Sequence, residues 1–372
     1  MNSLIIILVL AFLVLTFMVI SKVSSLTKNL NNGGQIDTES TPVDSYNDLN
    51  GKLLLGFFVV GTGLAVWSYL HFESRMVLPI ASKHGELSDR MFWLSMSMAL
   101  LGFFATNAAL FYFSYKYRYV KGRKATYYPV NHTLEYIWTA TPAILMAIMV
   151  FFGWKLWSDI TRQEPENATA VEIMGKQFGW YVRYGGADDN KLGAYNYKLI
   201  VDGKNDHGID LSDENSFDDF TATELHLKKG QPVVLKIRAR DVLHSVFLPH
   251  FRVKMDAVPG MPTKFWFTPT KSTAEMRYET GKSDFNYFIT CTEVCGRGHF
   301  GMRIPVFVDE EQDYNKWITT QPTWLSLNKG FLALVPEKLK VKATKYAGIE
   351  ASPTDSTSTA GAGTASSSAS LR

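Results

Sequence analysis

Cysteine is nearly absent from this sequence, because its 372 residues include only Cys291 and Cys295. The two do not form a C-x-x-C-H motif, so we expect no covalently attached haem c on this chain. Charge of one sign is also not in excess, since the formal net charge is +3 and no basic cluster alternates with aromatic residues. This balance excludes the strongly basic surface that is typical of nucleic-acid-binding proteins.

Charged residues are missing from four apolar stretches in the first 160 residues, each 18 to 25 residues long. A hydrocarbon core of about 30 Å needs roughly 20 helical residues, so each stretch is long enough to cross a membrane. The predicted transmembrane helices cover residues 1–22, 53–72, 91–117 and 134–158, and a polar loop covers 23–52. A secretory signal peptide is the alternative for the first, but it lacks a basic start and a good cleavage site, which favours an uncleaved anchor.

The loops between these helices indicate the orientation of the chain. Five Lys and Arg residues follow the third apolar stretch, whereas three lie between the second and the third. The positive-inside rule places the richer loop in the cytoplasm and everything after residue 158 outside. We therefore expect a multi-pass protein of the inner (plasma) membrane, in contact with lipid, whose C-terminal region lies on the periplasmic side.

The C-terminal region has the pattern of a β domain. Residues 168–310 contain short strand-like runs such as ELHLKKGQPVVLKIRA and TKFWFTP, with Gly and Pro between them. This pattern predicts an all-β antiparallel sandwich. An acidic insertion at 185–222 is interpreted as a solvated loop; the alternatives are a docking patch for a basic partner and a calcium site, although its spacing fits no calcium loop. An extension at 311–350 and a Ser/Thr/Ala/Gly-rich tail at 351–372, expected to be disordered, follow.

Both cysteines lie in the stretch CTEVCGRGHFGM, which also contains His299 and Met302. A disulfide would leave these two residues unexplained, and structural zinc prefers closer cysteines and no thioether. Thiolate, imidazole and thioether together are the ligand set of copper electron-transfer sites. Two thiolates on one loop could bridge two copper ions, each with one histidine; the second histidine would be His244, with His250 as a weaker candidate.

The segments DVLHSVFLPHFRVKMDAVPG and CTEVCGRGHFGM, with the helix start LEYIWTATPAIL, resemble subunit II of bacterial haem-copper cytochrome c oxidase. The resemblance covers about residues 91–310. It implies that membrane helices precede a cupredoxin-like domain with a dinuclear copper centre, CuA. This centre accepts electrons from a cytochrome c and relays them to the catalytic subunit I, which reduces O2 to water in a proton-pumping terminal oxidase. Because the family usually has two transmembrane helices here, we expect the two additional ones to pack against a neighbouring subunit.

The resemblance also implies the copper ligands. One copper would be held by Cys291, Cys295, Met302 and one of the two histidines, His244 or His299. The other would be held by both thiolates, the remaining histidine and the backbone carbonyl of Glu293. In the family the side chain of this glutamate also binds Mg²⁺ at the interface with subunit I.

Three further roles follow from the resemblance. Glu135 matches the glutamate at the mouth of a proton-uptake channel. Phe178 and Trp180 match the two tryptophans of the family's GxQWxW stretch, where electrons enter. Because the first tryptophan is replaced by phenylalanine, the donor is either a cytochrome c or, as a second hypothesis, a cytochrome c domain of a neighbouring complex. Asp241 and Asp256, which flank His244 in sequence, would orient ligands or form a polar exit.

Two other functions share some of these features. A membrane-tethered copper-binding or assembly protein would present exposed, loosely spaced Met and His residues, which this sequence does not do. Subunit II of a quinol oxidase has the same fold but lacks the copper ligands that are present here. Both alternatives are therefore disfavoured.

Overall fold

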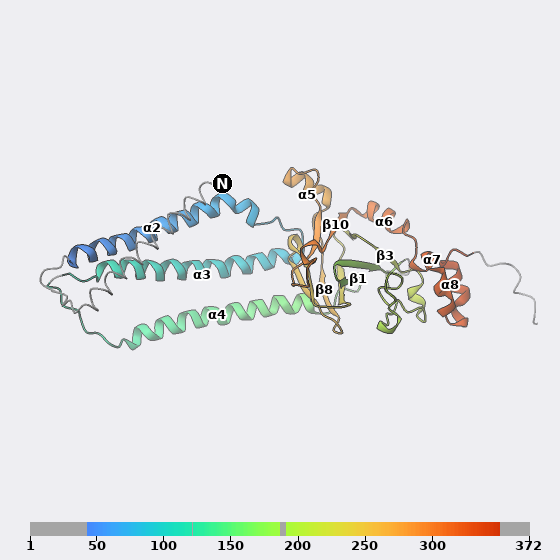
Figure 1. The fold of residues 1–372 in the computed structure, drawn as a ribbon, viewed down its shortest axis with the longest axis horizontal. Helices are drawn as coiled ribbons and strands as arrows, with labels where there is room; N and C mark the ends of the chain where they lie inside the picture. The colour runs from blue at the N-terminus through green and yellow to red at the C-terminus, as the bar shows by residue number, and fades with distance from the viewer. Residues whose placement is uncertain (1–42, 121, 187–190, 350–372) are drawn as a thin grey trace, which may run out of the picture. The chain divides into compact units, whose positions relative to one another are not determined.

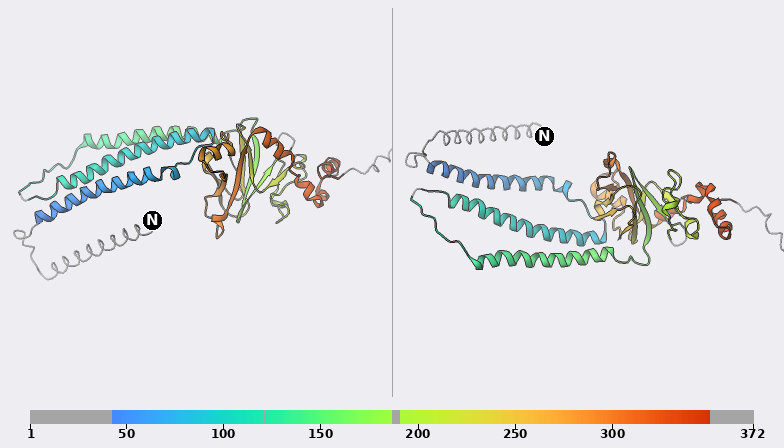
Figure 2. Two further views of the ribbon diagram at one scale, coloured as in Figure 1. Left: turned by 90° about the horizontal axis from the view of Figure 1, so that it is seen from above. Right: turned by 60° about the horizontal axis from the view of Figure 1, so that its bottom comes forward.

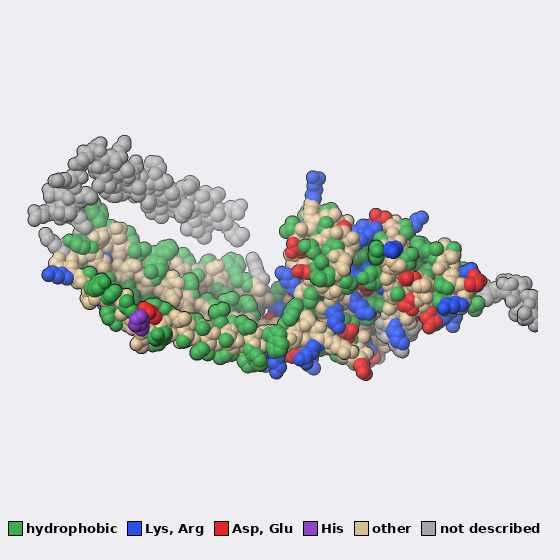
Figure 3. All heavy atoms as spheres, turned by 90° about the horizontal axis from the view of Figure 1, so that it is seen from below, with side chains coloured by type: hydrophobic (Ala, Val, Ile, Leu, Met, Phe, Trp, Pro, Cys, Tyr) green, Lys and Arg blue, Asp and Glu red, His purple; other side chains and the backbone are tan. Residues whose placement is uncertain are grey.

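The computed structural model describes residues 43–120, 122–186 and 191–349 (Figure 1). Three long helices come first: α2 (Val43–Met76), α3 (Lys83–Lys116) and α4 (His132–Thr161). All three are long and apolar enough to cross a membrane. Hydrophobic side chains cover much of their visible face, whereas charged side chains are spread over the β domain (Figure 3).

The predicted spans at 53–72, 91–117 and 134–158 fall on these three helices, and the predicted span at 1–22 lies outside the described residues. The predicted polar loop at 23–52 is wrong for residues 43–52, which form the first turns of α2. Asp48 and Lys52 make an ion pair of 2.6 Å there, one helical turn apart. Such a pair stabilises a helix, which explains why polar residues extend α2.

Ten strands of the described chain form two five-stranded sheets (Figures 1 and 2). The first sheet has the order β3-β2-β1-β5-β8 and the second β4-β10-β9-β6-β7. The strands are β1 (Thr169–Lys176), β2 (Gly179–Tyr184), β3 (Phe220–Ala222), β4 (Leu225–Lys228), β5 (Val233–Ala239), β6 (His244–Leu248), β7 (Val253–Ala257), β8 (Thr263–Phe267), β9 (Tyr287–Cys291) and β10 (Arg303–Asp309). The expected order of helices followed by a β sandwich is confirmed. The sheets are mixed, however, because β1 pairs with β5 and β4 with β10 in parallel.

The main hydrophobic core lies between the two sheets. Strand β9 shows the alternation that produces it, with Tyr287, Ile289 and Cys291 buried and the residues between them partly exposed. Ile160 near the end of α4 belongs to the same core. The membrane helix α4 therefore ends inside the domain that carries the cysteines.

The connection between α2 and α3 is also built into the β domain. Ala81 donates its N–H to the carbonyl of His250 at 2.8 Å and accepts a 2.8 Å bond from Thr270. Arg252 makes two bonds, of 2.7 and 2.8 Å, to Asp89 in the first turns of α3. These bonds attach the α2–α3 connection and the start of α3 to the segments that follow β6 and β8.

A second hydrophobic core joins the insertion to the C-terminal extension. The insertion contains the turns η1 (Tyr197–Leu199) and η2 (Glu214–Ser216), and the extension contains α6 (Glu311–Thr319), α7 (Trp324–Leu327), η5 (Lys329–Leu334), η6 (Glu337–Leu339) and α8 (Lys340–Tyr346). Ile209, Leu211 and Phe217 pack against Trp324 and Leu325 in this core. The interpretation of 185–222 as a solvated loop is therefore wrong for its second half. The expected tail at 351–372 lies outside the described residues.

Charged side chains are buried where the insertion meets the first sheet. Arg183 donates to Glu172 at 2.6 Å and to Asp219 at 3.1 Å, and none of the three is more than 3% exposed. Arg238 also pairs with Glu172, and His207 of the insertion is 2.9 Å from the same carboxylate. Burial alone would raise the pKa of Glu172, but Arg183, His207 and Arg238 hold it well below its usual range. Buried charges are stable only when paired, so the cluster holds the insertion against β1 and β2.

Candidate metal centre

The stretch with both cysteines connects β9 to β10, and we call residues 291–302 the ligand loop. Cys291 is the last residue of β9, and its N–H donates to the carbonyl of Met302 at 3.2 Å, which closes the loop. The turn η4 (His299–Gly301) precedes β10. His244 begins β6, a direct neighbour of β9 in the sheet. Strand pairing therefore brings a distant histidine to the loop.

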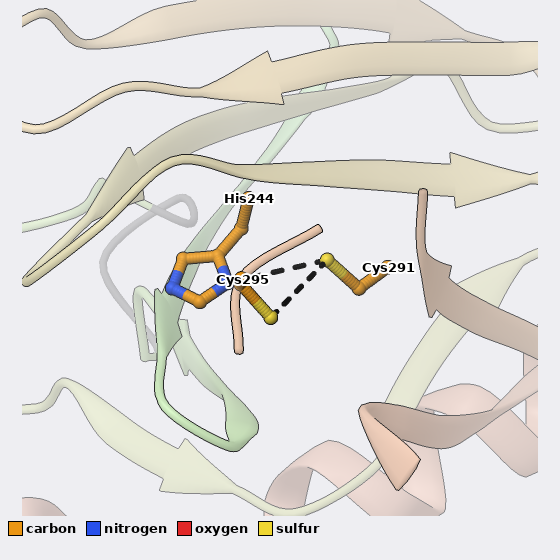
Figure 4. Close-up of side chains that lie close together, drawn as sticks. All are labelled: His244, Cys291 and Cys295. Atoms are coloured by element: carbon orange, nitrogen blue, oxygen red, sulfur yellow. Dashed lines mark hydrogen bonds between the residues drawn. The ribbon is translucent and has the colours of Figure 1, made fainter. Parts of the chain in front are cut away.

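Sulfur and imidazole nitrogen atoms converge at this point (Figure 4). The two Sγ atoms are 4.0 Å apart, and the Sγ of Cys291 is 4.0 Å from Nδ1 of His244. The Sγ of Cys295 is 3.6 Å from Nδ1 of His299 and 3.3 Å from the sulfur of Met302. A disulfide bond is about 2.05 Å long, so both cysteines are free thiols.

Glu293 contributes through its backbone. Its carbonyl oxygen accepts a 3.2 Å bond from the thiol of Cys291, while its side chain is exposed. The structure therefore brings together all six predicted ligands: two thiols, two imidazoles, a thioether and a carbonyl. His250 is not among them, because its Nδ1 bonds to the carbonyl of Pro79 at 3.0 Å. Soft sulfur with imidazole nitrogen suits copper, so the donor set fits the expected metal.

A carboxylate fixes the orientation of His244. The Oδ1 of Asp241 lies 2.9 Å from Nε2 of the imidazole, which leaves Nδ1 free to face the cysteines. The other oxygen accepts the N–H of Gln177 at 2.8 Å, and the side chain of Gln177 donates to the carbonyl of Cys295. Burial alone would raise the pKa of Asp241, but the bonds from Gln177, His244 and Val242 lower it. Asp241 is thus an ionised acceptor that connects His244 to the β1–β2 turn, and Gln177 in that turn reaches the ligand loop.

The carboxylate of Asp256 and the thiol of Cys295 differ in their surroundings. Asp256 accepts a 2.7 Å bond from the hydroxyl of Ser245, so it touches the neighbour of His244 and no ligand itself. Burial, together with the nearby Cys291, raises the pKa of Cys295 to about 11. The metal-free thiol is therefore neutral at pH 7, and metal binding would release its proton.

Two family models match this chain: the periplasmic domain of cytochrome c oxidase subunit II over residues 169–309, and the transmembrane domain of the same subunit over residues 65–156. The chain belongs to the cytochrome c oxidase subunit II family. The alternative cytochrome c oxidase subunit 2 of Bradyrhizobium diazoefficiens is 35% identical over 257 residues, which are 67% of this chain and 85% of that protein. The cytochrome c oxidase subunit 2 of a Synechocystis species is 24% identical and covers 78% of this chain and 92% of that protein.

Among solved structures, the periplasmic domain of subunit II of the cytochrome oxidase of Bradyrhizobium japonicum is 21% identical. It covers 42% of this chain and 96% of that domain, with a TM-score of 0.28. The predicted membership of this family is confirmed, and with it the chain is a subunit of an oxidoreductase complex of the respiratory chain. It is a membrane protein with a periplasmic domain, from a family that binds copper.

The two aromatic residues expected where electrons enter subunit II have different positions. Phe178 is 46% exposed, and its ring packs closely on the ligand loop. A Cβ added at Gly298 would lie only 2.5 Å from this ring. Trp180 is 4% exposed, and its ring centroid is 5.9 Å from that of His244. Of the two residues, only Phe178 therefore offers surface, because β2 alternates at its start and turns the side chain of Trp180 into the core.

Glu135 lies in the first turn of α4, where Asn131 caps the helix and His132 is 3.1 Å from the carboxylate. At 1.5 Å per residue, about 38 Å of helix separates it from Ile160 in the β domain.

Sequence reasoning missed Gln177, whose side chain and N–H link the ligand loop to Asp241. No spacing signal marks it, because its partners Asp241 and Cys295 lie in loops far from it in the sequence.

Proposed function

We propose that this subunit holds a dinuclear copper centre through which electrons enter a proton-pumping terminal oxidase. The cluster of His244, Cys291 and Cys295, which His299, Met302 and the carbonyl of Glu293 contact, supports this most strongly. One copper would be held by Cys291, Cys295, Met302 and one histidine. The second would be held by both thiolates, the other histidine and the carbonyl of Glu293. Two thiolate-bridged copper ions supply one-electron redox chemistry when bound.

The protein's own residues keep this site from rearranging. His244 is fully buried at the start of a paired strand, and Asp241 fixes its ring orientation. Cys295 and Met302 are at most 4% exposed, so water has little access to the sulfur atoms. Ligands that are held by a sheet and shielded from solvent change position little on a change of charge, which favours rapid electron transfer. Such burial also suits retention of copper better than delivery of copper to another protein.

The proposal includes partners on both sides of the site. The donor is a cytochrome c or the cytochrome c domain of a neighbouring complex, reached through Phe178, and the acceptor is subunit I, where O2 is reduced. The exposed carboxylate of Glu293 would share a Mg²⁺ ion with subunit I. Glu135, at the expected cytoplasmic end of α4, would take part in proton uptake, with the helices in contact with lipid.

Copper analysis and electron paramagnetic resonance of the purified oxidase test this function. We expect two coppers per subunit II at this site and one unpaired electron shared by two copper nuclei. Cys295→Ser should abolish that signal, whereas His250→Gln should retain it, since His250 bonds to Pro79 and not to the cluster. A sulfur–sulfur bond in the metal-loaded protein, or a single copper with hyperfine lines of one nucleus, would contradict the proposal.

A further inference from the structure

The insertion forms one wall of an apolar groove of about 390 Å³ on the β domain. The opposite wall is the turn between β7 and β8. The side chains that line the two walls are Tyr195, Tyr197, Ile200, Pro259, Met261 and Pro262. No pattern in the sequence predicts this groove, because its walls are about sixty residues apart in the chain.

The groove lies beside the surface through which electrons would enter. Arg240 lines the groove and directly precedes Asp241, the residue that bonds to His244 and to Gln177. Phe178 follows Gln177, and the exposed Val242 and Leu243 follow Asp241. We call Phe178, Val242 and Leu243 the acceptor face. Backbone and side-chain bonds thus connect the acceptor face to the rim of the groove.

The charged residues between the acceptor face and the groove neutralise one another. Asp202 of the insertion pairs with Lys176 and, at 3.0 Å, with Arg240. Asp206 pairs with Arg240 and lies 3.3 Å from Lys176. Two carboxylates therefore face two cations, so these four side chains together carry no net charge. A strongly basic donor would find these carboxylates already occupied, which argues against a docking patch for a basic partner.

The groove is held in shape before any partner arrives. The guanidinium of Arg238 lies 3.7 Å from the centre of the Tyr195 ring, and Arg238 is itself fixed by Glu172 and by the carbonyl of His207. Tyr197 and Met261 at the rim remain 70% and 56% exposed. Tyrosine, methionine and arginine are enriched in protein interfaces, and a preformed pocket loses little entropy on binding.

We propose that this groove receives apolar side chains of the haem c-bearing donor protein, which docks by apolar contact next to the acceptor face. This inference rests on the proposed function, since it names how the donor of that site is recognised. Apolar contact is not screened by ions, whereas recognition through opposite charges weakens as salt rises. The donor would then present apolar side chains to the groove on its contact surface.

The test uses native membranes that contain the complete respiratory chain, in which reoxidation of the endogenous haem c is followed after a pulse of O2. The double variant Tyr197→Ser and Met261→Ser removes the rim of the groove. We expect at least about a tenfold slower reoxidation, the loss typical of a central interface contact. Tyr278→Ser is the matched control, because Tyr278 is 93% exposed on α5 (Thr273–Thr280) and lines no part of the groove. The wild-type rate should change less than about twofold between about 50 and about 500 mM salt.

Hexaammineruthenium(II), a small one-electron reductant, separates this inference from the function on which it rests. We expect wild type and both variants to reduce O2 equally with this reductant, and to show the same copper resonance. Unchanged haem c reoxidation in the double variant would show that the groove is not the docking site. This conclusion also holds if the double variant changes self-association of the protein but not the rate of reoxidation. A wild-type rate that falls steeply with salt would overturn recognition by apolar contact. Failure of the wild type with hexaammineruthenium(II) would instead refute the proposed function.

Discussion

Gly175 in β1 is the position where one methyl group should disturb the metal centre. A Cβ there would lie 2.8 Å from Cδ2 of His244 and 3.0 Å from Cζ3 of Trp180. Neither ring can move outward easily, because His244 is fully buried and Trp180 is 4% exposed. We therefore expect Gly175→Ala to push the imidazole away from the position that Asp241 and Cys291 define for it.

The size of the effect follows from these distances. Carbon atoms pack best at about 3.5–4.0 Å, so the contact with His244 is short by roughly 0.7 Å or more. Overpacking of this kind costs about 1–3 kcal/mol. For a domain of this size each kcal/mol lowers the melting temperature by about 2–4 °C, so we expect a decrease of roughly 2–12 °C.

The matched control is Gly179→Ala, across the turn of the same hairpin, where β2 begins. A Cβ at Gly179 has only Tyr181 within reach, at an ordinary 3.9 Å. We expect Gly175→Ala, but not Gly179→Ala, to lower the melting temperature of the detergent-purified protein and to change the copper hyperfine pattern. Equal stability and identical spectra for the two variants would refute the argument from packing around His244.

Three further predictions concern stability. Glu172→Leu leaves Arg183 buried without its closest partner and should cost about 3–5 kcal/mol, measured as a lower melting temperature; a fully stable variant would show that the buried ion pairs are dispensable. Burial alone would lower the pKa of His226, but Asp309 and Glu224 raise it. The contribution of protonated His226 to stability is therefore fully present below about pH 6.5 and is lost as the pH rises through the raised folded-state pKa. His226→Gln should consequently lower the melting temperature more at about pH 5.5 than at about pH 9. A difference that does not vary with pH would exclude that contribution. Trp324→Ala removes the largest side chain of the second core, at a cost of about 3–5 kcal/mol, and should expose the insertion to limited proteolysis; an unchanged digestion pattern would separate the insertion from the extension.

The sequence was sufficient to bring most residues of the candidate metal centre together, because local spacing carries most of that arrangement. Four donors fall within twelve residues, and His244 lies in a recognisable segment. The surroundings of the centre could not be predicted in the same way. Gln177 reaches the ligand loop only because the β1–β2 turn lies against it, and this contact depends on the order of strands in the sheets.

The insertion shows more clearly which contacts cannot be predicted from the sequence. Its acidic residues are typical of a solvated loop. Asp206, however, pairs with Arg240, which directly follows β5, and Asp219 pairs with Arg183 on β2. Its apolar residues, such as Phe217, lack a periodic pattern because they pack against α7 and α8 and not within one element. Pairings between segments this far apart leave no signal in the spacing of one sequence.

The shared core of the insertion and the extension also constrains how the protein is made. Phe217 leaves the ribosome about a hundred residues before Trp324, the side chain that will cover it. At about 5–20 residues per second, that apolar surface waits roughly 5–20 s for its partner. During biogenesis the nascent periplasmic domain therefore exposes an apolar surface on the insertion, the segment that later lines the groove. A chaperone outside the membrane would have that interval in which to bind it.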